Sequence, residues 1–458
     1  MNRAVKRLKA DLQEHVILPG DARYDEKRSV YFTGVDRRPA AIVQPGSAEE
    51  VASVIRVVRD RGARLSVKGG GHGFTSAGVR DDTVVFDLSR FDGLELDVEA
   101  RVARAGGGLT TGAYTAAAAE RGLATGFGDS PLVGIAGIAL HGGIGFLHRR
   151  LGLTVDSLLG AQVVTAEGAI VEATPECHPD LLWALRGGGG NFGVVTRLDL
   201  RLHPVARVRG GMLMGGAEPA AVSRLLELFE DDADPAGDLS GIVQVMRAPP
   251  VPMLPAELHG KIICGVFVVH AGEPSAADRV LRQVSDLVPA TVGELGPMEY
   301  AQMFASEGGP PPPTLLRWSS SFTDMLGPHA VESAFERLAE PHSGTMRMVQ
   351  LRPMGAAVAS VDAGATAFAH RTAPLLLSAG ATFEEPSDGD AQRTWVRSVV
   401  DALGGTGNRG PYLGFLADQG VEAVRAGFPE SHWRRLRETK REYDPENVFD
   451  GNHNVPPA

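Results

Sequence analysis

The stretch Ser66-Val67-Lys68-Gly69-Gly70-Gly71-His72-Gly73 turns a short β-prone run into consecutive glycines that surround one histidine. Glycine has no Cβ, so such a loop allows unusual backbone angles and leaves its N–H groups open to a ligand. We expect this loop to suit an anionic group such as a pyrophosphate, with His72 as the nucleophilic side chain at its centre. A plain strand-to-loop turn with an exposed histidine is the alternative interpretation.

Short strands and helices alternate on both sides of this loop. The capping box Ser47-Ala48-Glu49-Glu50 opens an expected amphipathic helix. Strands are expected at 39–45, 65–68 and 83–88. Alternation of this kind with short loops indicates an α/β or α+β unit.

A second glycine cluster runs from Gly126 to Gly145 and carries almost no charge apart from Asp129 and His141. We expect it to be buried. The backbone groups of a buried loop need hydrogen-bond partners, which a bound cofactor could supply. Loop geometry alone remains the alternative reason for so many glycines.

The run Gly188-Gly189-Gly190-Asn191-Phe192-Gly193 matches the letters of the dinucleotide fingerprint G-x-G-x-x-G. That fingerprint follows a strand, opens a helix and has an acidic residue about 20 positions later. Here a helix is expected before the run and a strand after it, and the acidic residue is missing. We therefore reject a Rossmann NAD site. P-loop, nucleophile-elbow and zincin motifs are absent from the sequence, and its scattered histidines do not support a metal site.

Beyond about residue 205 the glycine signature fades, and the pattern favours an antiparallel sheet with helices on one face. The expected helices are 219–230, 275–287 and 391–403, and the expected strands are 261–270, 345–351 and 374–383. In the tail we expect a strand at 411–417 and a helix capped by Ser431.

Length and composition limit the class of protein. A chain of 458 residues suggests two or three folding units, and the net charge of −11 argues against nucleic acid or an anionic membrane as partner. Two cysteines far apart in sequence form no disulfide framework, so we expect a cytoplasmic protein. No apolar run is long enough to span a membrane.

Five segments, in this order, resemble motifs of the berberine bridge enzyme-like FAD-linked oxidases, within the vanillyl-alcohol oxidase (PCMH-type) flavoprotein superfamily: Lys68–Gly73, Val133–Gly145, Arg149–Leu159, Asp180–Val195 and Lys440–Phe449. The bacterial 6-hydroxynicotine oxidase-like branch is the most similar in character. The resemblance implies an α+β fold. A two-part FAD-binding domain would comprise 1–205 and 410–458, and a substrate-binding domain with an antiparallel sheet would comprise 206–409.

The same resemblance implies that His72 bonds covalently to the 8α-methyl carbon of FAD. Many relatives add a second bond from a cysteine before the proline of the second loop. Ser130 precedes Pro131 here, so a single bond is implied. Val133 stands where relatives control access of O2, which favours an oxidase. The other implied cofactor-binding residues are Lys68, Gly69, Gly70, Gly71, Gly73, Gly134, Gly137, Gly142, Gly143, Gly145, Val195 and Asn452.

Catalytic residues are less clearly marked. Tyr412 stands where relatives read Y-x-N, but Gly414 replaces the Asn, and Tyr412 could equally be a core aromatic. Gln350 stands where several relatives place a catalytic Glu, although Gln cannot be a base. Arg352, two residues on, is expected to face the same side of that strand. His141 is an expected lining residue or a satisfied loop histidine, and His370-Arg371 resembles a segment in which a structural ion pair is expected.

The function implied is hydride transfer from a small organic substrate (an alcohol, an amine or a secondary metabolite) to covalently bound flavin. O2 would reoxidise the flavin and give H2O2. A dehydrogenase of the same fold with another electron acceptor is one alternative, and a non-catalytic flavin-binding protein is another.

Overall fold

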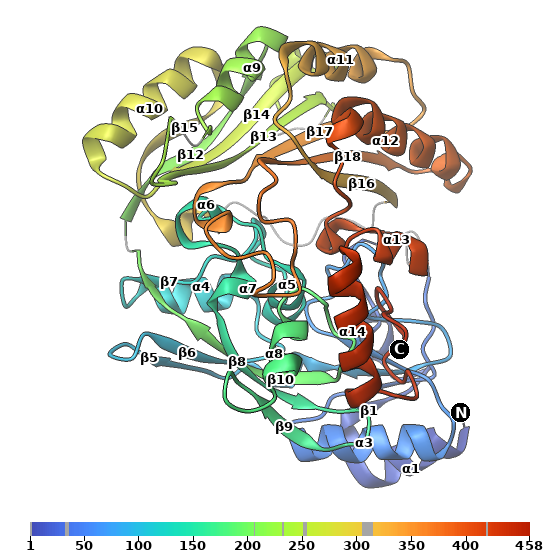
Figure 1. The fold of residues 1–458 in the computed structure, drawn as a ribbon. Coiled ribbons are helices and arrows are strands. Elements are labelled where there is room, and N and C mark those ends of the chain that lie inside the picture. Colours follow the sequence, from blue (N-terminus) through green and yellow to red (C-terminus); the bar gives the residue numbers. More distant parts are fainter. Residues whose placement is uncertain are drawn as a thin grey trace.

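The computed structural model describes residues 2–32, 36–205, 207–230, 233–250, 254–304, 315–417 and 420–458. Figure 1 shows two stacked halves, with the N-terminal part of the chain (blue to green) in one and the middle of the chain in the other. The red C-terminal segment returns to the first half. Helices and mostly antiparallel strands confirm the predicted α+β class.

A four-stranded sheet carries the first glycine loop. Its order is β1-β2-β4-β3, and β4 runs parallel to both β2 and β3. The predicted capping residue Ser47 accepts a hydrogen bond from the Glu50 N–H at 3.3 Å and so starts α3. The elements are β1 (Val16–Ile17), β2 (Ala41–Val43), β3 (Leu65–Lys68), β4 (Val84–Asp87), α1 (Asn2–Leu12), α2 (Tyr24–Lys27) and α3 (Ala48–Asp60). Glycines 69–71 therefore follow directly on the carboxyl end of β3.

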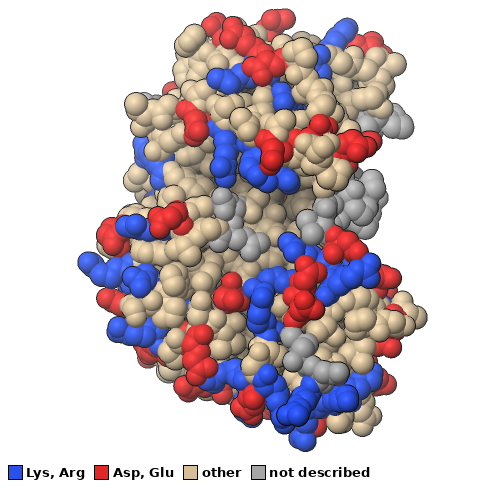
Figure 2. Space-filling model, turned by 90° about the vertical axis from the view of Figure 1, so that its right-hand side faces the viewer, with Lys and Arg blue, Asp and Glu red and all other residues tan. Residues whose placement is uncertain are grey.

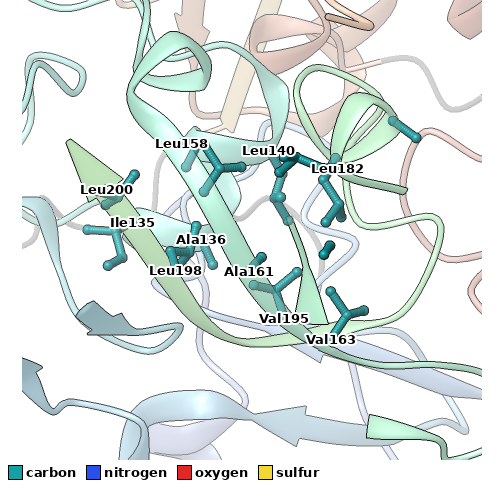
Figure 3. Packing of buried hydrophobic residues seen from close by; sticks show 14 of the residues in the cluster. Ile135, Ala136, Leu140, Leu158, Ala161, Val163, Leu182, Val195, Leu198 and Leu200 are labelled. Atoms are coloured by element: carbon teal, nitrogen blue, oxygen red, sulfur yellow. The ribbon is translucent and has the colours of Figure 1, made fainter. Parts of the chain in front are cut away.

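A five-stranded antiparallel sheet of order β5-β6-β10-β8-β9 supports the second glycine loop. Figure 3 shows side chains of α5, among them Ile135 and Leu140, against side chains of the sheet such as Leu158 and Leu198. This packing fixes α5, which begins inside the second loop. The elements are β5 (Leu94–Asp97), β6 (Val102–Gly106), β8 (Leu158–Val164), β9 (Ile170–Ala173), β10 (Val194–Arg201), α4 (Thr111–Ala119), α5 (Ile135–His141) and α8 (Pro179–Leu185).

Shorter elements complete this half. The two-residue strands β7 (Leu123–Ala124) and β11 (His203–Pro204) pair with each other. Two single-turn helices, α6 (His148–Leu151) and α7 (Thr154–Ser157), follow the second glycine loop.

A seven-stranded antiparallel sheet of order β15-β12-β14-β13-β17-β18-β16 forms the other half. Helices cover one of its faces, as the sequence pattern predicts, and the opposite face turns toward the glycine loops (Figure 1). The strands are β12 (Arg207–Gly216), β13 (Leu239–Arg247), β14 (Ile262–His270), β15 (Ala290–Glu299), β16 (Leu315–Thr323), β17 (Met346–Pro353) and β18 (Leu375–Phe383). The helices are α9 (Pro219–Glu227), α10 (Pro274–Leu287), α11 (Pro328–Ala339) and α12 (Gly389–Gly404).

The C-terminal segment corrects two predictions. Residues 411–417 form no strand. Tyr412 is extended, and the 3₁₀ turn η8 (Leu413–Phe415) follows it, closed by a Phe415 N–H to Tyr412 C=O bond of 2.9 Å. Ser431 is not a cap, because α14 (Glu430–Tyr443) already begins after Pro429. After α13 (Val421–Arg425), α14 lies beside α8 in the first half (Figure 1). The domain boundaries at 205 and 409 stay predictions.

None of the helices in the described part of the chain is long and apolar enough to cross a membrane. Among the same residues, histidine, cysteine and carboxylate side chains form no group that could hold a metal ion.

Candidate active site

The two glycine loops touch each other through their backbones. A Cβ added to Gly70 would lie 2.3 Å from the Gly134 nitrogen, and a Cβ added to Gly134 would lie 2.3 Å from the Gly70 nitrogen. No side chain fits at either position. The end of β3 and the start of α5 thus form one continuous surface of backbone, which glycine alone permits at this contact.

His72 lies at this junction among aromatic rings. Its ring stacks on Tyr31 with 4.0 Å between centroids and an angle of 23°, and Phe32 meets it edge-on. Burial lowers the pKa of His72 to about 4, and the Asp129 carboxylate opposes that shift. The imidazole is therefore neutral at neutral pH and keeps a nitrogen lone pair free for bonding.

The glycines of the second loop do not all serve the same purpose. Cβ positions at Gly142, Gly143 and Gly145 are filled by Tyr412, Thr154 and Phe127, and Gly142 and Gly143 have φ values of +139° and +78°. Packing and backbone geometry explain these three, which supports the loop-geometry interpretation for them. Gly137, in contrast, has no atom within 4 Å of its Cβ position.

The predicted cofactor residues of the first loop differ in what surrounds them. The Lys68 ammonium donates to the Lys27 carbonyl at 2.7 Å, and burial lowers its pKa. A Cβ on Gly69 would meet only the Gly107 carbonyl oxygen, at 3.7 Å. Gly71 has φ +73°, and a Cβ there would lie 3.3 Å from Lys68 Cε. Gly73 has an open Cβ position, with Thr75 Oγ1 3.8 Å away.

The segment from Ser130 to Val133 is anchored on the first turn of α4. Thr111 donates through its N–H to the Val133 carbonyl at 2.8 Å and through its hydroxyl to the Ser130 carbonyl at 2.6 Å. Gly112 N–H donates to the Pro131 carbonyl at 2.9 Å. This segment leads directly into Gly134 and holds it against Gly70.

The C-terminal tail also reaches the first loop. Asn452 Oδ1 accepts a hydrogen bond of 2.9 Å from the Thr75 hydroxyl. Asn454 Oδ1 is buried and has no partner in the described part of the chain. The Val195 side chain belongs to the core of the five-stranded sheet (Figure 3), and its carbonyl oxygen lies 2.4 Å from the Cβ position of Gly107. A packing role in that core explains its side chain.

Arg352 joins the seven-stranded sheet to the second loop. Its guanidinium donates to Gln350 Oε1 at 2.8 Å, to the Ile144 carbonyl at 3.1 Å and to the Asp129 carboxylate. It also lies 5.0 Å from the centre of the Phe415 ring. Gln350 and Arg352 share one side of β17, as the two-residue spacing predicts.

Asp129 is a site residue that the sequence reasoning missed. Its side chain is about one-third exposed while Arg352 is buried, and it influences the pKa of both His72 and Tyr412. The sequence does carry a signal for this residue, because Asp129 is the one carboxylate in the second glycine loop.

Tyr412 points its hydroxyl at the backbone. The oxygen accepts a hydrogen bond of 3.0 Å from the Gly143 N–H, and burial raises the pKa of Tyr412 to about 12. Its ring occupies the space over Gly414, where a Cβ would lie 2.6 Å from Tyr412 Cζ. The side chain is thus poorly suited to act as a base near neutral pH, and the core-aromatic interpretation describes it better.

His141 lies where the second loop, the Gly189 turn and the tail meet. Its Nδ1 is 2.8 Å from the Gly137 carbonyl oxygen, and its ring meets His453 edge-on at 5.6 Å. Burial lowers its pKa. Nε2 is buried without a hydrogen-bond partner among the described residues.

The predicted structural ion pair is present, because Arg371 binds Asp156 through two hydrogen bonds of 2.7 Å.

Aromatic side chains close the space between the two halves. Phe74, just after the first loop, lies 5.4 Å from Trp318 of β16 and 5.2 Å from Phe415, measured between ring centroids. Figure 2 shows the molecule hollowed at its waist, between the halves, with mostly uncharged atoms in the hollow. His72 follows β3 in one half, and Arg352 lies on β17 in the other.

These residues fit FAD on their own chemistry. The joined loops expose backbone without side chains at Gly69, and buried polar atoms of His141 and Asn454 lack partners in the described residues. Buried polar groups are normally hydrogen-bonded, so these atoms suggest contact with a bound molecule. A neutral histidine beside glycine loops adds a nucleophile.

Comparison with known proteins gives two matching family models. Residues 39–174 match the model described as FAD binding domain, and residues 415–456 match the model described as berberine and berberine like. The chain is 28% identical to (R)-6-hydroxynicotine oxidase of Paenarthrobacter nicotinovorans, over 97% of each protein. It is 25% identical to chitooligosaccharide oxidase of Gibberella zeae, over 96% of this chain and 91% of that protein.

Solved structures of two oxidases have the same fold as this chain. The crystal structure of 6-hydroxy-D-nicotine oxidase from Arthrobacter nicotinovorans superposes with a TM-score of 0.85 at 27% identity, covering 98% of each chain. Glucooligosaccharide oxidase from Acremonium strictum has a TM-score of 0.86 at 22% identity, covering 99% of each chain, which shows a shared fold.

Proposed function

The chain belongs to the berberine bridge enzyme-like FAD-linked oxidases, and from this premise we propose that it oxidises a small organic molecule with covalently held FAD and O2. FAD, when bound, supplies the two-electron acceptor, and O2 then becomes H2O2. The substrate is an alcohol, an amine or a related metabolite.

One observation supports the covalent part of the proposal most strongly. His72 is a neutral, partly buried imidazole at the point where the two glycine loops meet. Formation of a bond from nitrogen to carbon requires an unprotonated ring nitrogen, which the low pKa provides at neutral pH. Residue 130 is a serine, so we propose attachment through His72 alone.

We propose that Asp129 is the base that removes a proton from the substrate. Tyr412 holds its proton up to about pH 12, Gln350 cannot act as a base, and His141 turns its Nδ1 to a backbone carbonyl. Asp129 is ionisable and partly exposed, and one of its oxygens, Oδ2, is bound to Arg352. The other oxygen, Oδ1, is the atom we assign to accept the proton.

Arg352 has a positioning role. It holds Asp129 on one side and Gln350 on the other, and its contact with the Ile144 carbonyl ties β17 to the second loop. The groups that meet the substrate are thereby kept at a fixed distance from the glycine loops.

An oxygen electrode tests the proposal. The flavin-loaded protein is first mixed anaerobically with aromatic alcohols, amines and oligosaccharides, and bleaching of the flavin absorption identifies a substrate. We expect that substrate to consume O2 and form an equal amount of H2O2. Bleaching without O2 consumption would instead indicate a dehydrogenase with another acceptor, and no bleaching by any compound would favour a flavin-binding protein without catalysis.

A further inference from the structure

The face of the seven-stranded sheet that turns toward the glycine loops carries an unusual row of polar side chains. Ser320 pairs with Ser378, Ser378 with Gln350, and Gln350 with Gln244, across four neighbouring strands. Residues directly opposite each other in a sheet point to the same face. Gln350 fixes which face this is, because it binds Arg352, which reaches the second loop.

The alternate residues of the same strands point the other way. Val349, Ala379 and Val245, for example, belong to the core beneath helices α9 to α12. The polar row is therefore not part of that core, and its hydroxyls cannot be satisfied from the helical side.

Two hydroxyls of this row have unmet hydrogen bonds. Ser378 is fully buried and Ser320 is 7% exposed, yet neither Oγ has a partner within the described ranges. The indole N–H of Trp318, two residues from Ser320 on the same face, is likewise buried and unpartnered there. Buried polar groups are normally hydrogen-bonded, so three unpartnered groups together point to a ligand that completes them.

Beside the row lies an apolar shelf. Trp318, Gly380, Met348 and Met246 are successive register partners. A Cβ on Gly380 would lie 2.5 Å from the Trp318 ring and 3.3 Å from Met348. The indole therefore lies over a glycine, next to the methionine side chain, and its ring centroid is 5.4 Å from that of Phe74 and 5.8 Å from that of Phe415.

Charge on this part of the sheet is balanced. Among the described residues, Arg352 is the charged side chain that lies next to the row. Its positive charge already pairs with the Asp129 carboxylate and lies over the Phe415 ring. A ligand seated on Trp318 thus meets hydroxyls, an indole N–H and an amide, but no uncompensated charge.

We propose that the Ser320–Ser378–Gln350 row and the Trp318 shelf form the substrate-binding wall, and that they select a neutral, flat ring bearing a hydroxyl or carbonyl oxygen. The ring stacks on Trp318, and its oxygen binds the two serine hydroxyls. An oligosaccharide fits less well, because hydroxyls around the sugar would face Met348 and Met246 without partners. This inference rests on the proposed oxidase function, since it concerns the substrate of the same site.

Calorimetric titration of the flavin-loaded protein tests the wall without turnover. The probes are phenol, toluene and cellobiose, of which phenol and toluene share a shape but differ in the hydroxyl. We expect phenol to bind about tenfold more tightly than toluene, and cellobiose to bind more weakly than phenol. Equal binding of phenol and toluene, or tighter binding of cellobiose, would overturn the proposal.

Three variants separate the two parts of the wall. The double variant Ser320→Ala/Ser378→Ala should weaken phenol about tenfold and leave toluene unchanged. Gly380→Ala should weaken both compounds, because the new Cβ displaces the indole. Ser319→Ala, on the same strand but the opposite face, is the control and should match the wild type.

A cooperative thermal unfolding transition and unchanged flavin content establish that the variants fold. The proposal fails if the double serine variant binds phenol like the wild type. Because the titration needs no oxidation, phenol selectivity without flavin bleaching by any compound would reject the oxidase function but keep the binding wall.

Discussion

Gly70 and Gly134 touch through their backbones, with each Cβ position only 2.3 Å from the nitrogen of the other residue. One follows β3 in the four-stranded sheet and the other precedes α5, which packs on the five-stranded sheet. The contact therefore joins two separately supported loops into one surface, and His72 stands beside it.

The contact predicts that Gly70→Ala and Gly134→Ala both destabilise the protein and reduce its flavin content. A methyl group there must push the two loops apart, which we expect to lower the free energy of unfolding by about 1–3 kcal/mol. Urea unfolding and the ratio of flavin to protein absorption measure both effects. Gly137→Ala, where the Cβ position is open, is the matched control and should keep the stability of the wild type. Equal stability of Gly70→Ala and Gly137→Ala would contradict the contact.

Asp129→Asn is expected to lower kcat about 100-fold, because it removes the proposed proton acceptor. It also leaves the buried Arg352 guanidinium without its carboxylate, which we expect to cost about 1–3 kcal/mol of stability. Steady-state kinetics and urea unfolding separate these two effects. Adding Arg352→Met to Asp129→Asn should restore stability, because it removes the unpaired charge. The double variant should not regain kcat. Full activity of Asp129→Asn would exclude it as the acceptor.

The environment of His72 predicts how flavin attachment depends on pH. Burial lowers the pKa of His72 to about 4, so the ring loses its proton well below the usual pH. Attachment needs the neutral ring, and therefore flavin-free protein mixed with FAD should form the bond at similar rates at about pH 5.5 and pH 8. Acid-stable flavin fluorescence followed over time gives these rates. A tenfold slower reaction at the lower pH would mean that His72 keeps an ordinary pKa.

Tyr412→Phe tests whether the tyrosine has a chemical role. Its hydroxyl accepts from the Gly143 N–H, so the variant should lose about 1 kcal/mol of stability and keep kcat within about threefold. Gly414→Asn restores the pattern of the relatives but places a side chain where the Tyr412 ring lies, so we expect it to destabilise the protein without raising activity. A loss of kcat by several orders of magnitude in Tyr412→Phe would make Tyr412 catalytic.

Local sequence was sufficient for the parts of the site that local geometry determines. The strand before His72, the capped helix α3 and the alternation that places Gln350 and Arg352 on one face all depend on neighbouring residues. Contacts between distant segments were not predictable in this way. Nothing near Asp129 in the sequence points to Arg352, and nothing near Gly70 points to Gly134.

Tertiary packing explains one wrong prediction and bears on a second prediction that stays untested. Residues 411–417 look β-prone, but Tyr412 packs against Phe322, Phe368 and Phe415, and a 3₁₀ turn follows it. Gly142 and Gly143 stay predicted cofactor residues, and Tyr412 and Thr154 fill the space where their side chains would be, so packing also explains why they are glycines. In both cases the relevant feature is tertiary packing, which composition does not reveal.

Acid precipitation of the purified protein tests the central claim most directly, because it asks whether His72 holds the flavin by a covalent bond. We predict that flavin fluorescence stays with the precipitated wild-type protein and is released into the supernatant from His72→Ala. His329→Ala, which changes an exposed histidine of α11, serves as the control and should retain fluorescence in its precipitate. Release of all flavin from the wild-type protein would contradict the covalent role of His72.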